Sequence, residues 1–455
     1  MLKDSFKERM MHLLGEDYES FISALEKEPV RGVRANRIKT STEHLLGITS
    51  LDLVPLSYLD NGFILRDGDG VGNTPEHHAG MIYVQDPGAM SALSAIDIGE
   101  GEWVLDMCAA PGGKSSQIAE RIGDGGFLLS NEFVPKRAKI IVGNFERLGV
   151  RNAMVTSLDT KEFPKMFYNV FDTVVCDAPC SGEGMFRKSD EALADWSEEN
   201  VKMCAARQLT ILENAIPILK DGGRLIYSTC TYSLEENEMV VAELIKRHPE
   251  LRLIPVKDEL KRSTKDGIDF DKSHPEMHLA RRFYPHVSEG EGQFVAVMQK
   301  GEKSADKTTI LYKDEALSPS KSEIQIAEKF LKDIFTTRPE GRLIKQGDFI
   351  VLVSHTCPIP KRSVFMPGVV IGEIQKNILK PHHQLFSAYG NEMKTVVDLK
   401  KGDERIKKYL RGEEIECDTS LSGFCAVTYE GVPLGGGKIS SGRVKNHYPK
   451  GLRNN

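Results

Sequence analysis

Apolar and polar positions alternate in a regular block between about residues 102 and 247. Short apolar runs with the length of buried strands lie near 102–107, 126–131, 153–156, 171–176 and 223–229. Stretches with apolar residues at helical spacing lie between and after them, near 114–122, 135–148, 194–219 and 233–247. Strand and helix units that repeat with short connections predict a parallel, doubly wound α/β sheet. Right-handed crossovers then bring the carboxyl ends of all its strands to one edge.

The pattern is less regular on both sides of this block. Residues 1 to about 50 are predicted to be mostly helical, and residues 81–98 to form a strand followed by a helix. A last strand at 293–298 is predicted at the sheet edge, antiparallel to its neighbour. The polar, irregular stretch from about 300 to 320 indicates a linker. Beyond it we expect a helix, and then short strands with many glycines.

Composition places the chain among ordinary globular proteins. The 455 residues are enough for two to four domains, and 40% of them are hydrophobic and 28% charged. The first residues contain no apolar core of signal-peptide length, and no apolar run approaches the ~18 residues that a membrane span needs. A cytoplasmic protein that does not bind membranes is therefore expected.

The net charge of -6 argues against a general nucleic-acid coat protein, but two segments reverse it locally. Residues 30–39 contain four basic residues and no acid, which fits either a solvated loop or a strand that contacts phosphates. Residues 431–455 contain five basic residues and no acid, together with residues able to pack. This favours a small β-rich nucleic-acid-binding domain over a disordered tail.

Eight cysteines are spread over the chain, with no CxxC pair and no Cys/His cluster at zinc-finger spacing. We therefore expect thiols and no metal site. Cys180 and Cys230 are distinctive because they follow the fourth and fifth predicted strands, in polar turns. Inert cysteines are expected inside an element, whereas reactive thiolates need partly exposed, polar surroundings. Neighbouring strand ends can bring both thiols to one ligand.

The other strand ends carry carboxylates and a loop of small residues. Ala109 to Gly113 allow a ligand to approach the backbone closely, but the loop lacks GxGxxG, and Pro111 removes an amide donor that a pyrophosphate would use. An adenosine compound with a smaller anionic end, such as S-adenosylmethionine, fits better. Glu132 would bind its ribose and Asp159 its adenine amino group. Either carboxylate could instead only cap the following helix.

Several motifs resemble those of the NOL1/NOP2/Sun family of RNA (cytosine-5) methyltransferases. They are Arg34-Ala-Asn-Arg37, Gln85-Asp86-Pro87, Cys108-Ala-Ala-Pro-Gly-Gly-Lys114, Asp177-Ala-Pro-Cys-Ser-Gly182, Ser228-Thr-Cys-Thr231 and Tyr284-Pro-His286 ahead of Gln293-Phe294. The resemblance spans about residues 25–300. The remainder, with Pro433-Leu-Gly-Gly-Gly-Lys438 and Lys445-Asn-His-Tyr-Pro-Lys-Gly-Leu-Arg453, is similar to the bacterial 16S rRNA subgroup, which ends in a PUA-like domain.

This resemblance implies a role for each motif. Cys230 would be the nucleophile that adds to C6 of cytosine, and Cys180 would assist product release as a base. Asp177 would contact N3 as an acid. The cofactor, S-adenosylmethionine, would be bound by Cys108, Ala109, Ala110, Pro111, Gly112, Gly113, Lys114, Glu132, Asp159 and Asp177. RNA, as 16S rRNA or the small ribosomal subunit, would be the partner of a monomeric enzyme.

The domain organisation follows from pattern and resemblance together. We expect a Rossmann-like methyltransferase domain with a small N-terminal α+β domain and a β-rich, PUA-like C-terminal region. The predicted limits are 1–95 for the N-terminal RNA-binding domain, 96–300 for the methyltransferase domain, 301–321 for a linker, 322–390 for a first C-terminal α/β domain and 391–455 for the PUA-like domain.

Three alternatives stay open at this point. An amino-methyltransferase would need an aromatic residue where Cys180 stands, and would leave a second thiol idle. A non-catalytic RNA-binding protein of ribosome assembly would not need Cys230. The same chemistry could also act on tRNA in place of 16S rRNA.

Overall fold

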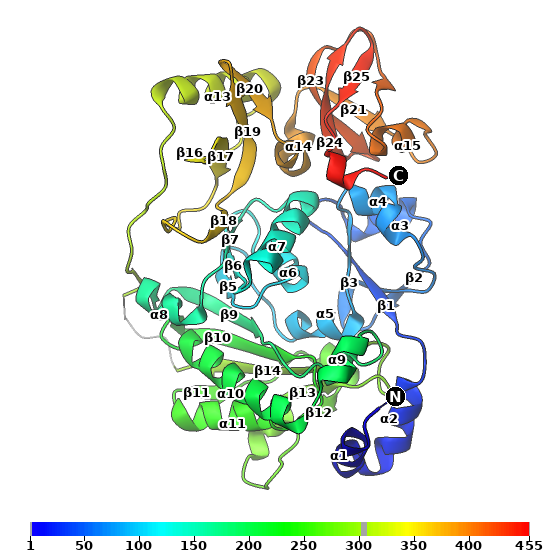
Figure 1. The fold of residues 1–455 in the computed structure, drawn as a ribbon, viewed down its shortest axis with the longest axis vertical. Coiled ribbons are helices and arrows are strands. Elements are labelled where there is room, and N and C mark those ends of the chain that lie inside the picture. The colour runs from blue at the N-terminus through cyan, green and yellow to red at the C-terminus, as the bar shows by residue number, and fades with distance from the viewer. Residues whose placement is uncertain (1, 302–306, 455) are drawn as a thin grey trace.

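The computed structural model describes residues 2–301 and 307–454 (Figure 1). At its centre is a ten-stranded sheet whose path runs β12-β13-β14-β10-β9-β5-β6-β7-β18, with β11 (Leu251–Leu253) paired to β14. Its parallel core consists of β10 (Leu219–Thr229), β9 (Phe171–Asp177), β5 (Trp103–Asp106), β6 (Phe127–Asn131) and β7 (Ala153–Thr156). Antiparallel strands extend it through β14 (Gln293–Lys300), β13 (Arg281–Phe283) and β12 (Lys265–Asp266). The predicted doubly wound sheet and the antiparallel direction of the strand at 293–298 are confirmed. Its predicted place at the sheet edge is wrong, because β13 and β12 continue the sheet beyond it.

Helices cover both faces of this sheet. On one face α5 (Pro87–Ser94), α6 (Gly113–Ile122) and α7 (Pro135–Leu148) contribute to one apolar cluster. On the other, α10 (Glu198–Ala215) and α11 (Glu238–Arg247) contribute to a second. Strand side chains alternate between the two clusters, as Leu105 and Val104 do, because successive residues of a strand point to opposite faces.

Two predicted helices are shorter than expected. The helix predicted at 194–219 is divided into α9 (Asp190–Asp195) and α10, because the Ser197 hydroxyl accepts the backbone N–H of Asn200 at 3.1 Å and starts a new helix. The helix predicted at 233–247 begins only at Glu238. The preceding residues form a turn, in which the backbone N–H of Asn237 donates to the Leu234 carbonyl at 3.2 Å.

The other end of the central sheet is completed by a distant part of the chain. Strand β18 (Val364–Met366) pairs antiparallel with β7. Within the stretch predicted as a linker, β15 (Thr309–Ile310) pairs with β8 (Phe167–Tyr168); residues 302–306 of that stretch lie outside the described residues. Chain beyond residue 300 therefore pairs with the central sheet at β7 and, in a separate two-stranded sheet, with β8.

The N-terminal region builds a four-stranded sheet of order β2-β3-β1-β4, with β2 (Leu53–Leu56), β3 (Leu59–Leu65), β1 (Arg31–Ala35) and β4 (Ile82–Val84). Its helices are α1 (Asp4–Leu14), α2 (Tyr18–Leu25), α3 (Thr42–Ile48) and α4 (Pro75–His78). Phe6 and Phe21, on α1 and α2, pack in a cluster with Trp196 and Tyr232 of the central domain. These two helices lie at one end of the molecule in Figure 1.

The C-terminal region contains two sheets. The first has β16 (Arg342–Gln346), β17 (Phe349–Val353), β19 (Val369–Gln375) and β20 (Ile378–Pro381), with α13 (Lys321–Ile334) and α14 (His383–Tyr389). The second has β21 (Val396–Leu399), β23 (Gly423–Tyr429), β24 (Val432–Ser440), β25 (Arg443–Asn446) and β22 (Ile415–Glu416), with α15 (Arg405–Leu410). The second sheet shares an apolar cluster with the N-terminal sheet, so the first and last parts of the chain pack together. Among the described residues, the helices are too short or too polar to cross a bilayer.

Candidate active site

The loop between β5 and α6 needs its glycines for different reasons. Gly112 adopts a φ of 109°, in the left-handed region that favours glycine. A Cβ atom on Gly113 would lie 2.9 Å from the Tyr83 ring and 3.1 Å from the Gln85 amide carbon. The loop therefore fits closely against the end of β4. Lys114, the second residue of α6, directs its side chain to the strand ends.

Asp177, at the end of β9, is held by three donors from three elements. The Lys114 ammonium group donates to Oδ2 at 2.8 Å. The Ser228 hydroxyl and the Gln293 amide donate to Oδ1 at 2.6 and 3.3 Å. Because donors from α6, β10 and β14 converge on it, the Asp177 carboxylate has a fixed position at the shared edge of the strands.

Asp106 lies behind the loop and lines neither cavity described below. It is fully buried and accepts the Ser115 hydroxyl at 2.6 Å. Burial is the main cause that raises its pKa to about 7. Asp106 thus supports the loop from behind.

The two thiols predicted from the strand ends do meet. Cys180 Sγ and Cys230 Sγ lie 3.2 Å apart, and both cysteines are half-buried. The contact with Cys230, and then burial and the charge of Glu236, raise the pKa of Cys180 well above its ordinary value. Cys180 is therefore a protonated thiol at neutral pH.

Two cavities adjoin at these residues, since Cys108, Ala110, Asp177 and Cys230 line both of them. The larger has a volume of 890 Å³ and extends towards Glu132 and Asp159. The smaller has a volume of 300 Å³. Besides the shared residues, its lining includes Lys114, Tyr83, Val84, Gln85, Met185, Gly292 and Gln293. Two ligands, one bound in each cavity, would contact each other beside the two thiols and Asp177.

Matches to known families cover most of the chain. Residues 93–299 match the model of 16S rRNA methyltransferase RsmB/F, residues 2–87 the N-terminal domain of 16S rRNA methyltransferase RsmF, and residues 396–454 the methyltransferase RsmF PUA domain. Ribosomal RNA small subunit methyltransferase F of Vibrio vulnificus is 32% identical over 99% of this chain and 97% of its own length. The chain belongs to the 16S rRNA methyltransferase RsmF family. The protein of that name from Klebsiella pneumoniae is 30% identical over 96% of this chain and 92% of its own.

Solved structures agree with the fold of this RsmF-family methyltransferase. A methyltransferase homologue from Pyrococcus horikoshii is 30% identical, with a TM-score of 0.57 over 66% of this chain and 95% of its own. NSun6 from the same organism, solved with SFG, has a TM-score of 0.57 at 21% identity over 66% of this chain and 99% of its own. The Rossmann-like fold and the PUA domain expected from the sequence are confirmed, and S-adenosylmethionine is the cofactor of the enzyme.

Glu132 and Asp159 line the larger cavity of this RsmF-family protein and also accept backbone N–H groups. Glu132 is 4% exposed, and its Oε1 accepts the N–H of Val134 at 2.9 Å. Asp159 accepts the N–H of Lys161 at 3.1 Å and pairs with its ammonium group at 2.9 Å. Each carboxylate therefore accepts a backbone N–H with one oxygen and pairs with an exposed cation through the other, Glu132 with Arg137 at 3.6 Å and Asp159 with Lys161.

The residues of the small-residue loop differ in the cavity that they line. Cys108 and Ala110 line both cavities, whereas Ala109, Pro111, Gly113 and Lys114 line only the smaller one, and Gly112 lines neither. The loop is thus a wall between the cavities, and Lys114 faces the smaller cavity.

Sequence reasoning missed residues that lie on or directly after β4 and directly before α7. Tyr83, Val84 and Gln85 line the smaller cavity, and the buried Gln85 Oε1 has no hydrogen-bond partner among the described residues. Phe133, which is 65% exposed, and Val134 line the larger one. The available signals were the Gln85-Asp86-Pro87 motif and the apolar pair directly after Glu132.

The basic segment 30–39 contains a strand, but two of its basic residues cannot contact phosphates. Arg34 is fully buried and binds Glu120 of α6 at 2.5 Å and the Ser116 hydroxyl at 2.6 Å. Lys39 is buried too, and donates to the carbonyls of Ser387 and Pro433 at 2.6 and 2.9 Å. The expectation that this segment contacts RNA is therefore wrong for these two residues, which join domains instead.

A basic surface does occur on the C-terminal sheets. Lys438 on β24 and Lys445 on β25 are exposed partners across the strands, and Lys380 on β20 is exposed beside them. Burial, and then the charges of these three lysines, lower the pKa of His447. None of the three has an ion-pair partner in the part of the chain that the structure describes. Phe424 adds an aromatic ring 5.4 Å from the Lys438 ammonium group.

Proposed function

We propose that the protein transfers a methyl group from S-adenosylmethionine to C5 of a cytidine in 16S rRNA, through a covalent adduct of Cys230 with C6, in the cytoplasm. The observation that carries this proposal is the pair of thiols, Cys180 and Cys230, 3.2 Å apart where two cavities adjoin. An amino-methyltransferase or a non-catalytic RNA-binding protein has no use for two such thiols.

The larger cavity fits the cofactor. Its 890 Å³ lies within the usual range for ligand sites, and it joins acidic residues at one end to the thiols at the other. Glu132 would bind the ribose hydroxyls and Asp159 the adenine amino group, with Phe133 along the adenine. Cys108 and Ala110 would contact the amino-acid end. Bound there, S-adenosylmethionine supplies the methyl group.

The smaller cavity is the place for the target base, which must be turned out of its stack to enter. Cytosine C5 is a poor nucleophile until a thiolate adds to C6, so Cys230 attacks first. The ring then gains negative charge, which protonation at N3 relieves. Asp177 acts as the acid at N3. The proton comes from the Lys114 ammonium group, which donates a hydrogen bond to Asp177, and passes through the Asp177 carboxyl group to N3.

After the methyl group has been transferred, the hydrogen at C5 leaves as a proton, with Cys180 as its base or relay. Bonding of Cys230 to C6 removes the thiol contact that chiefly raises the pKa of Cys180, so Cys180 can give its own proton to water and accept the one from C5. The electron pair of that C–H bond restores the C5–C6 double bond and expels the Cys230 thiolate. RNA would be held outside the cavities by exposed lysines of the C-terminal sheets, with Phe424 offering a ring on which a base can stack.

The decisive variant is Cys180→Ala, incubated with cofactor and a 16S rRNA transcript and run on a denaturing gel. We expect a stable protein–RNA adduct that disappears when Cys230 is also replaced by Ala. Methylation that is unaffected by Cys230→Ala would contradict the covalent scheme. Bisulfite sequencing of total RNA from a deletion strain then locates the cytidine, and loss of signal in tRNA alone would contradict the proposed substrate.

A further inference from the structure

Glu236 has a fully buried carboxylate that lines neither cavity. It lies in the turn between β10 and α11, six residues after Cys230. No Lys, Arg or His of the described residues lies within 4.0 Å of it as an ion-pair partner. A buried carboxylate without a cation is costly unless hydrogen bonds offset the lost hydration. Its hydrogen bonds therefore indicate its role.

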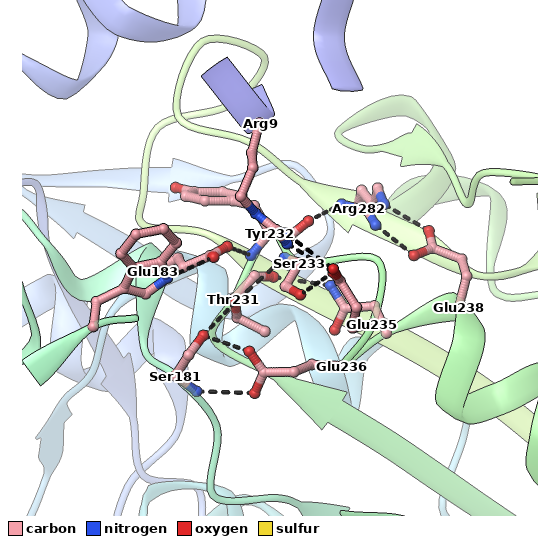
Figure 2. A network of polar contacts seen from close by, with 12 residues as sticks. Arg9, Ser181, Glu183, Thr231, Tyr232, Ser233, Glu235, Glu236, Glu238 and Arg282 are labelled. Carbon is pink, nitrogen blue, oxygen red and sulfur yellow. Dashed lines mark hydrogen bonds and ion pairs between the residues drawn. The ribbon is translucent and has the colours of Figure 1, made fainter. Parts of the chain in front are cut away.

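Those hydrogen bonds hold the chain on both sides of Cys180. The backbone N–H of Ser181 donates to Glu236 Oε2 at 2.9 Å, and the Ser181 hydroxyl donates to Oε1 (Figure 2). The Gln208 amide donates to Glu236 Oε2 at 2.8 Å and to the Pro179 carbonyl at 3.0 Å. Glu236 and Gln208 together thus bind both residues that flank Cys180.

The same bonds tie the Cys180 turn to the Cys230 turn. The hydroxyls of Ser181 and Thr231 lie 3.0 Å apart, and Thr231 directly follows Cys230. Gln208 is fixed in turn, because the Tyr227 hydroxyl donates to its Oε1 at 3.0 Å. The short distance between the thiols is therefore set by buried contacts that involve no ligand.

We propose that Glu236 is the positioning residue that holds Cys180 in place for the release step. The inference rests on the proposed function, in which the proton from C5 passes to Cys180 while the C–H electrons restore the double bond and expel Cys230. The addition step needs Cys230 alone, so a displaced Cys180 should halt the reaction after methyl transfer. Loss of Glu236 should then reproduce the effect of losing Cys180.

The test uses the full chain with Glu236→Ala, cofactor and a 16S rRNA transcript. We expect the same protein–RNA adduct on a denaturing gel as with Cys180→Ala, and turnover reduced by about 100-fold, the lower end of what a placed acid–base group contributes. Cofactor binding should be retained, because Glu236 does not line the larger cavity. A variant that is merely unstable would lose cofactor binding and form no adduct.

Glu235→Ala is the matched control. The neighbouring Glu235 carboxylate binds Arg9 of α1 at 2.7 Å and the Ser233 hydroxyl at 2.8 Å, away from the Cys180 turn (Figure 2). It should form no adduct and keep turnover near that of the unchanged protein. An adduct in this control equal to that of Glu236→Ala would overturn the specific role of Glu236.

Two further variants keep the test decisive. Glu236→Gln preserves the shape and can keep all three hydrogen bonds if the Ser181 hydroxyl reverses its donor role, so turnover should stay within about tenfold, or 1.4 kcal/mol. Gln208→Leu releases Pro179 from the other side and should give the adduct even if Glu236→Ala fails to fold. Variants that bind cofactor but form no adduct, while Cys180→Ala does, would overturn the inference. Absence of an adduct in Cys180→Ala would instead overturn the thiol scheme.

Discussion

At the scale of single residues, the site depends on polar groups whose partners come from other elements. Asp177 is useful only because Lys114, Ser228 and Gln293 fix it beside the thiols. Cys180 is held as a protonated thiol by Cys230, by burial and by the charge of Glu236. Burial raises the pKa of the Asp106 carboxyl group as well, but this residue lies behind the loop. A shifted pKa therefore indicates a catalytic residue only when the side chain faces a cavity.

Lys114→Met should lower both the stability of the protein and the rate of methyl transfer, and a second change at Asp177 should separate the two effects. The change leaves Asp177 with two donors, so the free energy of unfolding should fall by about 1–3 kcal/mol in urea titrations. Single-turnover methylation should slow by about 100-fold, because N3 loses its proton supply. Adding Asp177→Asn should recover most of the stability and none of the rate. A double variant that recovers the rate would contradict the role of this ion pair.

Asp106 should make stability depend on pH in a defined direction. Its pKa is about 7 in the folded protein and near 3.9 in the unfolded chain, so the folded state binds more protons between these values. Its contribution to stability is thus present below about pH 4 and falls by roughly 1.4 kcal/mol per pH unit up to about pH 7. Urea titrations of Asp106→Asn across this window should lack that contribution. Identical slopes with and without Asp106 would contradict the assignment.

At the scale of elements, the five parallel strands could be predicted because each is a local apolar run between turns. Their shared edge then predicted that Cys180, Cys230 and Asp177 lie close together. Strand β18 could not be predicted, since its partner β7 is about 200 residues away and pairing across such a distance has no local pattern. The smaller cavity was missed for the same reason. Its wall at Tyr83 and Gln85 belongs to another sheet, and only the close approach to Gly113 brings it to the site.

Gly113→Ala tests that close approach. The new Cβ would lie 2.9 Å from the Tyr83 ring, so β4 must move, at a cost of about 1–3 kcal/mol in unfolding free energy. KM for RNA should rise more than cofactor affinity falls, because Gly113 lines only the smaller cavity. Gly143→Ala on α7 is the matched control: nothing lies within 4 Å of its Cβ, so it should be stabilising or neutral. Equal effects of the two changes would contradict the close fit.

At the scale of the whole molecule, the first and last sheets share one apolar cluster, and Lys39 joins them to α14 through buried hydrogen bonds. The C-terminal sheets therefore have a fixed relation to the site, and a basic surface on them can orient RNA towards the cavities. Lys438 and Lys445 face each other across neighbouring strands, which costs stability without an anion between them. The terminal excess of basic residues was visible in the sequence, whereas the contribution of Lys380 from another sheet was not.

Lys438→Gln combined with Lys445→Gln should weaken binding of a 16S rRNA transcript and reduce its dependence on salt. Each lost phosphate contact lowers the slope of log K against log salt by about 0.7–0.9. Turnover at saturating RNA should be unchanged. Lys407→Gln with Lys408→Gln, exposed on α15, serves as the control and should leave the slope as it is. An unchanged salt dependence in the Lys438 and Lys445 double variant would show that this surface does not bind the RNA.

The covalent role of Cys230 is tested most directly by trapping the adduct in the unchanged protein. A 16S rRNA transcript made with 5-fluorocytidine carries fluorine at C5, which no base can remove as a proton, so release should stop after methyl transfer. Digestion with protease and nuclease, followed by mass spectrometry, should find a methylated fluorocytidine nucleotide on the peptide that contains Cys230. A nucleotide attached to Cys180, or no attached nucleotide while methyl groups still reach ordinary RNA, would contradict the mechanism.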